Sequence, residues 1–372
     1  MRHRLVASTA ATAVDDVVRS LVALHSTDPA SVFLAVAARA PSLGAAAIER
    51  ALYDERGVVR MLGIRRTVWV VPREDVAVVH AAVTRTIAVR QRTLLLQHLE
   101  RGGVTRDPER WLRDAERATL RELEARGEAS ATELTADVPA LRAKLTIDGI
   151  TGGVSTRVLF LLAADGRIVR GRPRGSWTSS QYRWSLAEAW LGSGMEEVPA
   201  QVAEAELARR WLRAFGPGTT NDLKWWTGWT VTQTRRALSA IDAVEVEVDG
   251  GTAYVLPDDL EPVALDEPAA ALLPALDPTA MGWSGRAWYL GDHAPLLFDR
   301  TGNVGPTVWV DGRIVGGWAQ RPDGEVVVRL LEDVGREAAA AVTAAAARTQ
   351  AFIGAVRVTP RFRTPLEREL SS

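Results

Sequence analysis

Apolar residues along this chain follow two spacings, one typical of amphipathic helices and the other of short strands. Three stretches share the order of helix, turn, second amphipathic helix and β-hairpin, which is the order of a winged helix. The second helices are predicted at residues 45–53, 155–163 and 231–238. The hairpins are predicted at residues 58–61 with 67–71, 166–171 with 182–184, and 243–248 with 253–256. The pattern therefore predicts three winged-helix units in tandem.

Helix-start and turn signals support these units. Ser130 and Glu133 have the spacing of a capping box, and Thr219 with Asp222 repeats it in the third unit. In the third hairpin, Asp249 precedes two glycines between strands of alternating polarity, a strong hairpin signal.

Beyond about residue 260, short apolar strands dominate the pattern. Strands are predicted at residues 271–276, 307–310, 313–315 and 326–330, followed by a helix over 332–352 and a last strand near 355–358. This region is expected to form a small β-barrel or curled sheet with one packing helix. The fold class is α+β, and the expected domains are a first winged helix with a linking helix, two further winged helices and the β-barrel, at residues 1–100, 101–195, 196–258 and 259–372.

Composition narrows the class of protein. Hydrophobic residues make up 47% of the chain and charged residues 24%, which is ordinary for a globular protein. No apolar run is long enough for a membrane helix, and Asp15 and Asp16 interrupt the place of a signal-peptide core, so we expect a cytoplasmic protein. Cysteine is absent, which excludes thiolate zinc sites and iron–sulfur clusters, and the five histidines are scattered, so a metal site assembled by folding has no support in the sequence and none is expected.

The net charge of −1 does not indicate a wholly basic nucleic-acid binder, but nearly all the cations are arginines. Coding bias explains most of them, so their clustering is the informative feature. Three clusters lie on predicted wings or on a second helix and are predicted to contact DNA: Arg65 and Arg66, Arg170, Arg172 and Arg174, and Arg235 and Arg236. The alternative is a solvated surface on which some of them pair with acids such as Asp242 or Glu55.

Two pairs of segments carry a family resemblance. The first pair is residues 21–30 and 61–69, and the second is residues 272–278 and 302–318. Both are similar to the winged-helix DNA-binding proteins that include the AlkZ/YcaQ-type bacterial DNA glycosylases. The resemblance implies three winged helices followed by a β-barrel. It also implies excision of N7-alkylated purines from double-stranded DNA, including interstrand crosslinks, without a cofactor.

The sequence departs from this family at one loop. Where AlkZ-type enzymes carry Gln-x-Gln and YcaQ-type enzymes Gln-x-Asp, this chain has His25, Thr27 and then Asp28. In a catalytic interpretation, His25 orients or deprotonates a water, Thr27 shares that water, and Asp28 stabilises positive charge or steers the imidazole. In the alternative, Thr27 or Asp28 caps a helix that begins at Pro29, and His25 is a partly buried histidine.

Tryptophans offer candidates for a base pocket. Trp309 and Trp318 lie in a segment that carries the resemblance and are predicted to line the place of a damaged base, with barrel packing as the alternative. The leading hypothesis is a monomeric DNA repair glycosylase. The alternative is a winged-helix regulator or lesion-binding protein without catalysis.

Overall fold

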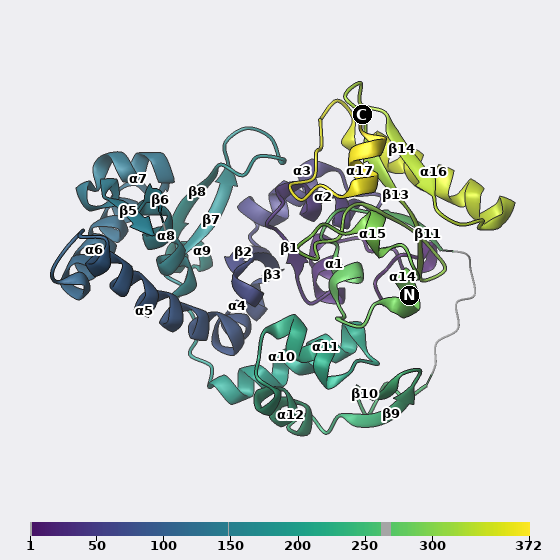
Figure 1. The fold of residues 1–372 in the computed structure, drawn as a ribbon, viewed down its shortest axis with the longest axis horizontal. Helices are drawn as coiled ribbons and strands as arrows, with labels where there is room; N and C mark the ends of the chain where they lie inside the picture. The colour runs from purple at the N-terminus through teal and green to yellow at the C-terminus, as the bar shows by residue number, and fades with distance from the viewer. Residues whose placement is uncertain (1, 148, 262–268) are drawn as a thin grey trace.

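The computed structural model describes residues 2–147, 149–261 and 269–372. It is a mixed α/β fold with 48% helix and 19% strand. In Figure 1, one lobe on the left holds α5 to α9, and the N-terminal and C-terminal parts of the chain lie together on the right above α10 to α12. Among the described residues, no helix is long and apolar enough to cross a membrane.

The first unit is built around a three-stranded antiparallel sheet of order β1-β3-β2. After the short turn η1 (Ala7–Thr9), its elements are α1 (Val14–Ser20), β1 (Leu24–His25), α2 (Pro29–Ala37), α3 (Ala45–Glu49), η2 (Arg50–Asp54), β2 (Val58–Leu62), η3 (Ile64–Arg66) and β3 (Val68–Pro72). The predicted second helix and hairpin are both present. The two-residue strand β1 was hidden inside the apolar run that continues α1.

A run of helices leads to the second unit. It consists of η4 (Arg73–Asp75), α4 (Val76–Val79), η5 (His80–Thr84), α5 (Arg85–Arg101) and α6 (Pro108–Arg126). The unit continues with β4 (Glu128–Ser130), α7 (Ala131–Asp137), η6 (Pro139–Arg142), β5 (Lys144–Ile147), β6 (Ile150–Gly153), α8 (Ser155–Ala164), β7 (Ile168–Pro173), β8 (Tyr182–Leu186) and α9 (Ala187–Leu191). Its sheet has the order β4-β8-β7, and Ser130 and Glu133 form the predicted capping box.

The third unit repeats the arrangement with a shorter first strand. It contains α10 (Ala200–Phe215), α11 (Thr220–Thr227), α12 (Val231–Ser239), β9 (Val244–Val248) and β10 (Gly251–Val255). Gly218 forms an isolated antiparallel bridge with Tyr254 of β10. In all three units, the chain segment before the helices therefore pairs with the second strand of the following hairpin.

The C-terminal region is an open sheet, so the predicted β-barrel is wrong. Four antiparallel strands lie in the order β11 (Ala270–Leu273), β12 (Thr307–Val310), β13 (Arg313–Gln320) and β14 (Val326–Leu330). Within the described residues, β11 and β14 are edges that do not pair, because four strands are too few to curl round and meet. The expected packing helix is present as α16 (Gly335–Ile353), which contacts β11 and β14. Short helices complete the region: α13 (Pro278–Met281), α14 (Ala287–Leu290), α15 (Ala294–Leu297) and α17 (Pro365–Leu370).

The strand predicted near residues 355–358 does not form. Instead, the buried amide of Gln320 replaces a strand partner: its Oε1 accepts from the Val358 N–H at 2.8 Å, and its Nε2 donates to the Val356 carbonyl at 3.2 Å. A side chain thus satisfies backbone groups that a ladder would otherwise pair.

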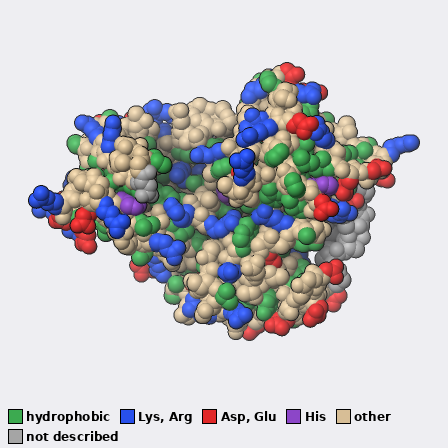
Figure 2. Space-filling model, in the orientation of Figure 1, with side chains coloured by type: hydrophobic (Ala, Val, Ile, Leu, Met, Phe, Trp, Pro, Cys, Tyr) green, Lys and Arg blue, Asp and Glu red, His purple; other side chains and the backbone are tan. Residues whose placement is uncertain are grey.

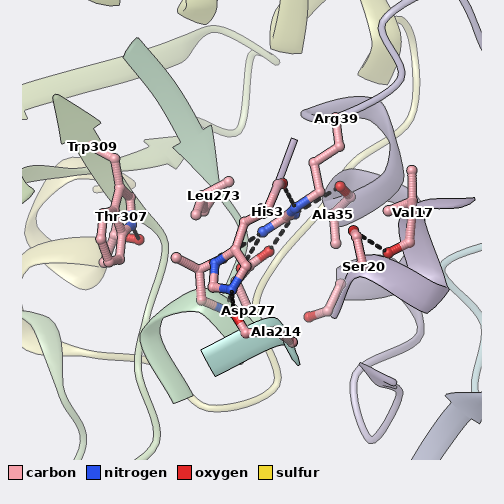
Figure 3. Close-up of polar contacts among 12 residues, drawn as sticks. His3, Val17, Ser20, Ala35, Arg39, Ala214, Leu273, Asp277, Thr307 and Trp309 are labelled. Carbon is pink, nitrogen blue, oxygen red and sulfur yellow. Dashed lines mark hydrogen bonds and ion pairs between the residues drawn. The ribbon is translucent and has the colours of Figure 1, made fainter. Parts of the chain in front are cut away.

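Two cores hold the molecule together. One joins the first unit, the third unit and the C-terminal sheet, and the other lies mainly within the second unit. The first core contains a fully buried ion pair, in which Arg39 of the segment after α2 binds both carboxylate oxygens of Asp277. Figure 3 shows this pair beside His3, which lies close to the Ala214 carbonyl. It links the first unit to the C-terminal region.

Candidate active site and nucleic-acid interface

The loop predicted to carry the chemistry begins at β1. His25 pairs with Trp69 of β3, and the two rings meet edge to face with centroids 4.7 Å apart. Just before the loop, Val22 has a φ of 65°, a conformation that a β-branched residue rarely adopts. The loop therefore leaves α1 through a strained turn, which fixes His25 against the sheet of the first unit.

His25 is neutral in this environment. Its side chain is almost fully buried, and burial lowers its pKa to about 3, with the nearby Arg65 guanidinium lowering it as well. The Thr27 N–H donates to His25 Nδ1 at 3.4 Å. A neutral imidazole with an accepting Nδ1 carries its proton on Nε2, so His25 offers a hydrogen-bond donor there.

Asp28 and Thr27 have different surroundings. Asp28 is the N-cap of α2, its Oδ1 accepting from the Ala30 N–H and its Oδ2 from the Arg361 N–H. Burial raises the pKa of Asp28, while these two N–H groups oppose the rise. Thr27 Oγ1 is buried without a hydrogen-bond partner. The structure thus gives Asp28 the capping role that the alternative interpretation assigned to this turn.

An arginine that the sequence analysis did not single out is hydrogen-bonded to the loop. Arg60, in the middle of β2, donates from Nε to Ser26 Oγ at 2.7 Å and from Nη1 to Tyr53 Oη at 2.6 Å. Its guanidinium also lies over the ring of Tyr182, with Cζ 4.6 Å from the centroid. A charged residue inside the otherwise apolar run of β2 was the available signal, because such a residue needs a special reason to be buried.

Arg65 and Arg66 form the turn between β2 and β3 and reach the other two units. Both have positive φ values, 52° and 63°. Arg65 stacks on Trp225 of α11, with Cζ 4.1 Å from the ring, and Arg66 lies over Phe160 of α8 at 5.9 Å. The turn therefore sits where the three units meet.

The other predicted DNA-contacting arginines fall into two groups. Arg172, Arg174 and Arg236 are paired with acids, namely Glu49 and Asp54, Glu133, and Glu204. The sequence-based candidates for such pairing were wrong: Glu55 pairs with Arg50, and Arg236 uses Glu204 instead of Asp242.

The second group has no carboxylate partner within the described part of the chain. Arg170 stacks on Trp184 at 4.8 Å, and Arg235 is exposed with no acid partner among the described residues. Among the described residues, six arginines lie over aromatic rings without an acid partner: Arg56, Arg60, Arg65, Arg66, Arg170 and Arg286. A ring holds the guanidinium in place without cancelling its positive charge.

Charged side chains are unevenly distributed over the surface. Figure 2 shows Lys and Arg side chains along the middle of the face, beside a hollow between the left lobe and the C-terminal part. Asp and Glu side chains lie mostly toward the edges of this view. A protein with a net charge of −1 thus presents a locally positive face.

The predicted base-pocket tryptophans do not join His25. Trp309 stacks on Tyr289, with centroids 5.4 Å apart, and lines a cavity of about 660 Å³ beside Trp283 and Trp288. Trp318 donates from Nε1 to the Leu273 carbonyl and is buried in the sheet. His25 is not among the residues that line this cavity.

We found no candidate metal site in the part of the chain that the structure describes. No three His, Asp or Glu side chains there lie close enough to hold an ion.

Comparisons with known proteins agree with this architecture. The family model of the AlkZ-like DNA glycosylases matches residues 18–352. Among solved structures, the chain is similar to the Streptomyces sahachiroi DNA glycosylase AlkZ, with a TM-score of 0.73 and 21% identity over 97% of this chain and 96% of that one. No curated protein sequence matches the chain.

Proposed function

Because the chain belongs to the AlkZ-like DNA glycosylase family, and is thus a DNA repair glycosylase, we propose that its substrates are N7-alkylated purines in double-stranded DNA. An N7-alkylpurine is already cationic, so its glycosidic bond is weak and the base leaves with little acid assistance. The enzyme then has to hold the lesion, stabilise an oxocarbenium-like transition state and position a water.

We propose that the three repeated units are winged helices and that the domains end near residues 100, 195 and 258. DNA would lie against the positive face that Figure 2 shows. What supports this is the shared pairing of the first segment with the hairpin in each unit, together with the turn of Arg65 and Arg66 at their junction.

His25 is the proposed catalytic residue, in the role of a neutral group that orients water. The single observation that carries this assignment is its burial as a neutral imidazole at the junction of the units. A pKa of about 3 makes it a poor base near neutral pH, and its Nδ1 already accepts from Thr27. A neutral imidazole also does not repel the cationic lesion or the positive transition state, as an imidazolium would.

Asp28 and Thr27 support the loop in this proposal. Asp28 fixes the start of α2 and ties the loop to the C-terminal segment through Arg361. Thr27 positions the imidazole through its backbone N–H.

The test is release of free base from duplex DNA that contains N7-methylguanine. We expect release by the wild type, a loss of about 100-fold or more in His25→Ala, and substantial recovery in His25→Gln, because glutamine also orients water without acting as a base. Duplex binding by each variant is measured in parallel and should stay unchanged.

Two outcomes would revise the proposal. Release that survives His25→Ala would remove His25 from the mechanism and leave the glycosylase intact. Salt-sensitive DNA binding by the wild type with no release from this substrate would contradict the N7-alkylpurine assignment and favour the binding-protein alternative.

A further inference from the structure

Among the described residues, two arginines are almost completely buried. Their guanidinium groups differ in the number and charge of their hydrogen-bond partners. Arg39 has every part of its guanidinium occupied. Nε donates to the His3 carbonyl, Nη1 to Ala35 and Asp277, and Nη2 to Asp277 and Thr279. This site, drawn in Figure 3, shows how the fold stabilises a buried guanidinium when the charge serves structure alone.

Arg60 has no such compensation. It is 2% exposed, its two hydrogen-bond acceptors are the neutral hydroxyls of Ser26 and Tyr53, and its Nη2 is buried without a partner. No carboxylate is among its hydrogen-bond or ion-pair partners in the described structure. A buried cation with an unpartnered N–H group lowers the stability of the fold. Its presence is therefore better explained by a role in function than by a role in stability.

A second free guanidinium group comes from the neighbouring unit. Arg170 of β7 has its Nη1 buried without a partner, although its guanidinium lies over Trp184. Burial lowers the pKa of Arg170 to about 10, Tyr182 opposes this, and the charge of Arg60 adds to it. β2 contacts β7, and Arg60 lies over the ring of Tyr182 in β8, the strand that pairs with β7, so the two arginines belong to the same contact between the units.

Two acids of the neighbouring α3 and η2 already pair with another arginine. Arg172, the next charged residue along β7, binds Glu49 and Asp54 and lies over the ring of Tyr53. These carboxylates neutralise Arg172, so the pair of Arg60 and Arg170 keeps its positive charge.

We propose that Arg60 and Arg170 form a binding site for a phosphoryl anion at the junction of the first and second units. The two unpartnered N–H groups can donate to phosphate oxygens, for which the guanidinium is well suited. The occupant is a backbone phosphate of DNA or free inorganic phosphate. The DNA arm rests on the proposed function, and the inorganic arm does not.

The position of the site links binding to the candidate active site. Arg60 Nε holds Ser26, the neighbour of His25. Because both free nitrogens are covered by protein, a phosphate reaches them only after the two units shift at the β2–β7 contact. A DNA phosphate bound here would lie next to the loop that carries His25. Phosphate binding at this site would therefore affect the position of that loop.

The experiment measures inorganic phosphate binding to the full chain by calorimetry and by the shift in melting temperature, with sodium chloride of equal ionic strength as the reference. We expect the wild type to bind phosphate and Arg170→Met to bind it at least about tenfold more weakly. Arg60→Lys, which keeps the positive charge, should bind phosphate with an affinity between those two. Arg174→Gln, an acid-paired arginine on the following loop, is the matched control and should bind phosphate like the wild type. Arg60→Met is informative only if its melt stays cooperative, and Arg170→Met keeps the test independent of it.

A second arm uses an undamaged duplex, which requires no chemistry. Weaker duplex binding by Arg170→Met than by Arg174→Gln, with no phosphate effect, would identify the diester as the occupant and support the site. Phosphate and duplex binding that are equal in the wild type, Arg170→Met and Arg60→Lys would overturn it. Failure of base release alone would contradict the proposed function and leave the phosphate site standing.

Discussion

The protonation state of His25 makes a prediction that distinguishes orientation of water from base catalysis. Since burial lowers its pKa to about 3, the imidazole stays neutral throughout the range of about pH 5 to 8 in which an ordinary histidine titrates. Base release should therefore show no inflection near pH 6.5 that belongs to His25. The measurement is the single-turnover rate against pH for wild type and His25→Gln, which should have the same shape. An inflection present only in the wild type would contradict a neutral role.

Asp28 offers a second prediction at the same scale. Asp28→Asn keeps an oxygen for the Ala30 N–H but places an amide against the Arg361 N–H. We expect a loss of about 1–3 kcal/mol in the free energy of unfolding, with base release by the folded variant within a few-fold of wild type. Chemical denaturation and single-turnover assays check the two parts. A carboxylate that acts in catalysis would instead cost about 100-fold or more in rate.

The surroundings of these two residues show which features of the site could be predicted from the sequence. The helix start at Asp28 and Pro29 was readable because N-capping is a local property. The roles of Arg60 and Tyr182 were not readable, since they depend on a contact between strands of two different units. Likewise, the sequence could place arginines on wings but could not say which of them an acid neutralises.

At the scale of elements, hairpins and helices followed local signals closely. The third hairpin pairs Val248 with Gly251 around Asp249 and Gly250, as the turn sequence indicates. The two capping boxes formed, and a third one at Thr230 and Gln233 was overlooked. The barrel and the last strand failed because closure and pairing depend on partners far away in the chain.

Gln320 tests this account of the missing strand. Its amide donates to the Gly324 and Val356 carbonyls and accepts from the Val358 N–H. Gln320→Leu should cost about 1–3 kcal/mol for each buried backbone group that is left without a partner. Denaturant unfolding gives the loss, and faster amide exchange at Val358 should accompany it. Gln350→Leu is the comparison, because Gln350 also donates to the Gly324 carbonyl, whereas the Val358 N–H donates to Gln320.

At the scale of the whole molecule, the net charge does not indicate a DNA-binding protein, whereas the distribution of the charges does. The net charge is −1, yet six arginines lie over aromatic rings and have no acid partner among the described residues. The monomeric state stays a prediction. The order of helices followed by a hairpin in three units was predicted from the sequence pattern, whereas the pairing of the preceding segment with each hairpin and the junction around Arg65 and Arg66 were not.

The last prediction separates the two groups of arginines by their effect on DNA affinity. Arg66→Gln and Arg235→Gln remove charge that is free to meet phosphate, whereas Arg172→Gln and Arg236→Gln remove charge already paired with acids. Each free arginine that contacts a phosphate should reduce the salt dependence of duplex binding by about 0.9 in the slope of log K against log salt. The paired ones should change the slope much less, because breaking the ion pair offsets the phosphate contact. Affinity measured over a series of salt concentrations decides this, and equal slopes for both groups would mean that pairing in the free protein does not select the DNA-binding arginines.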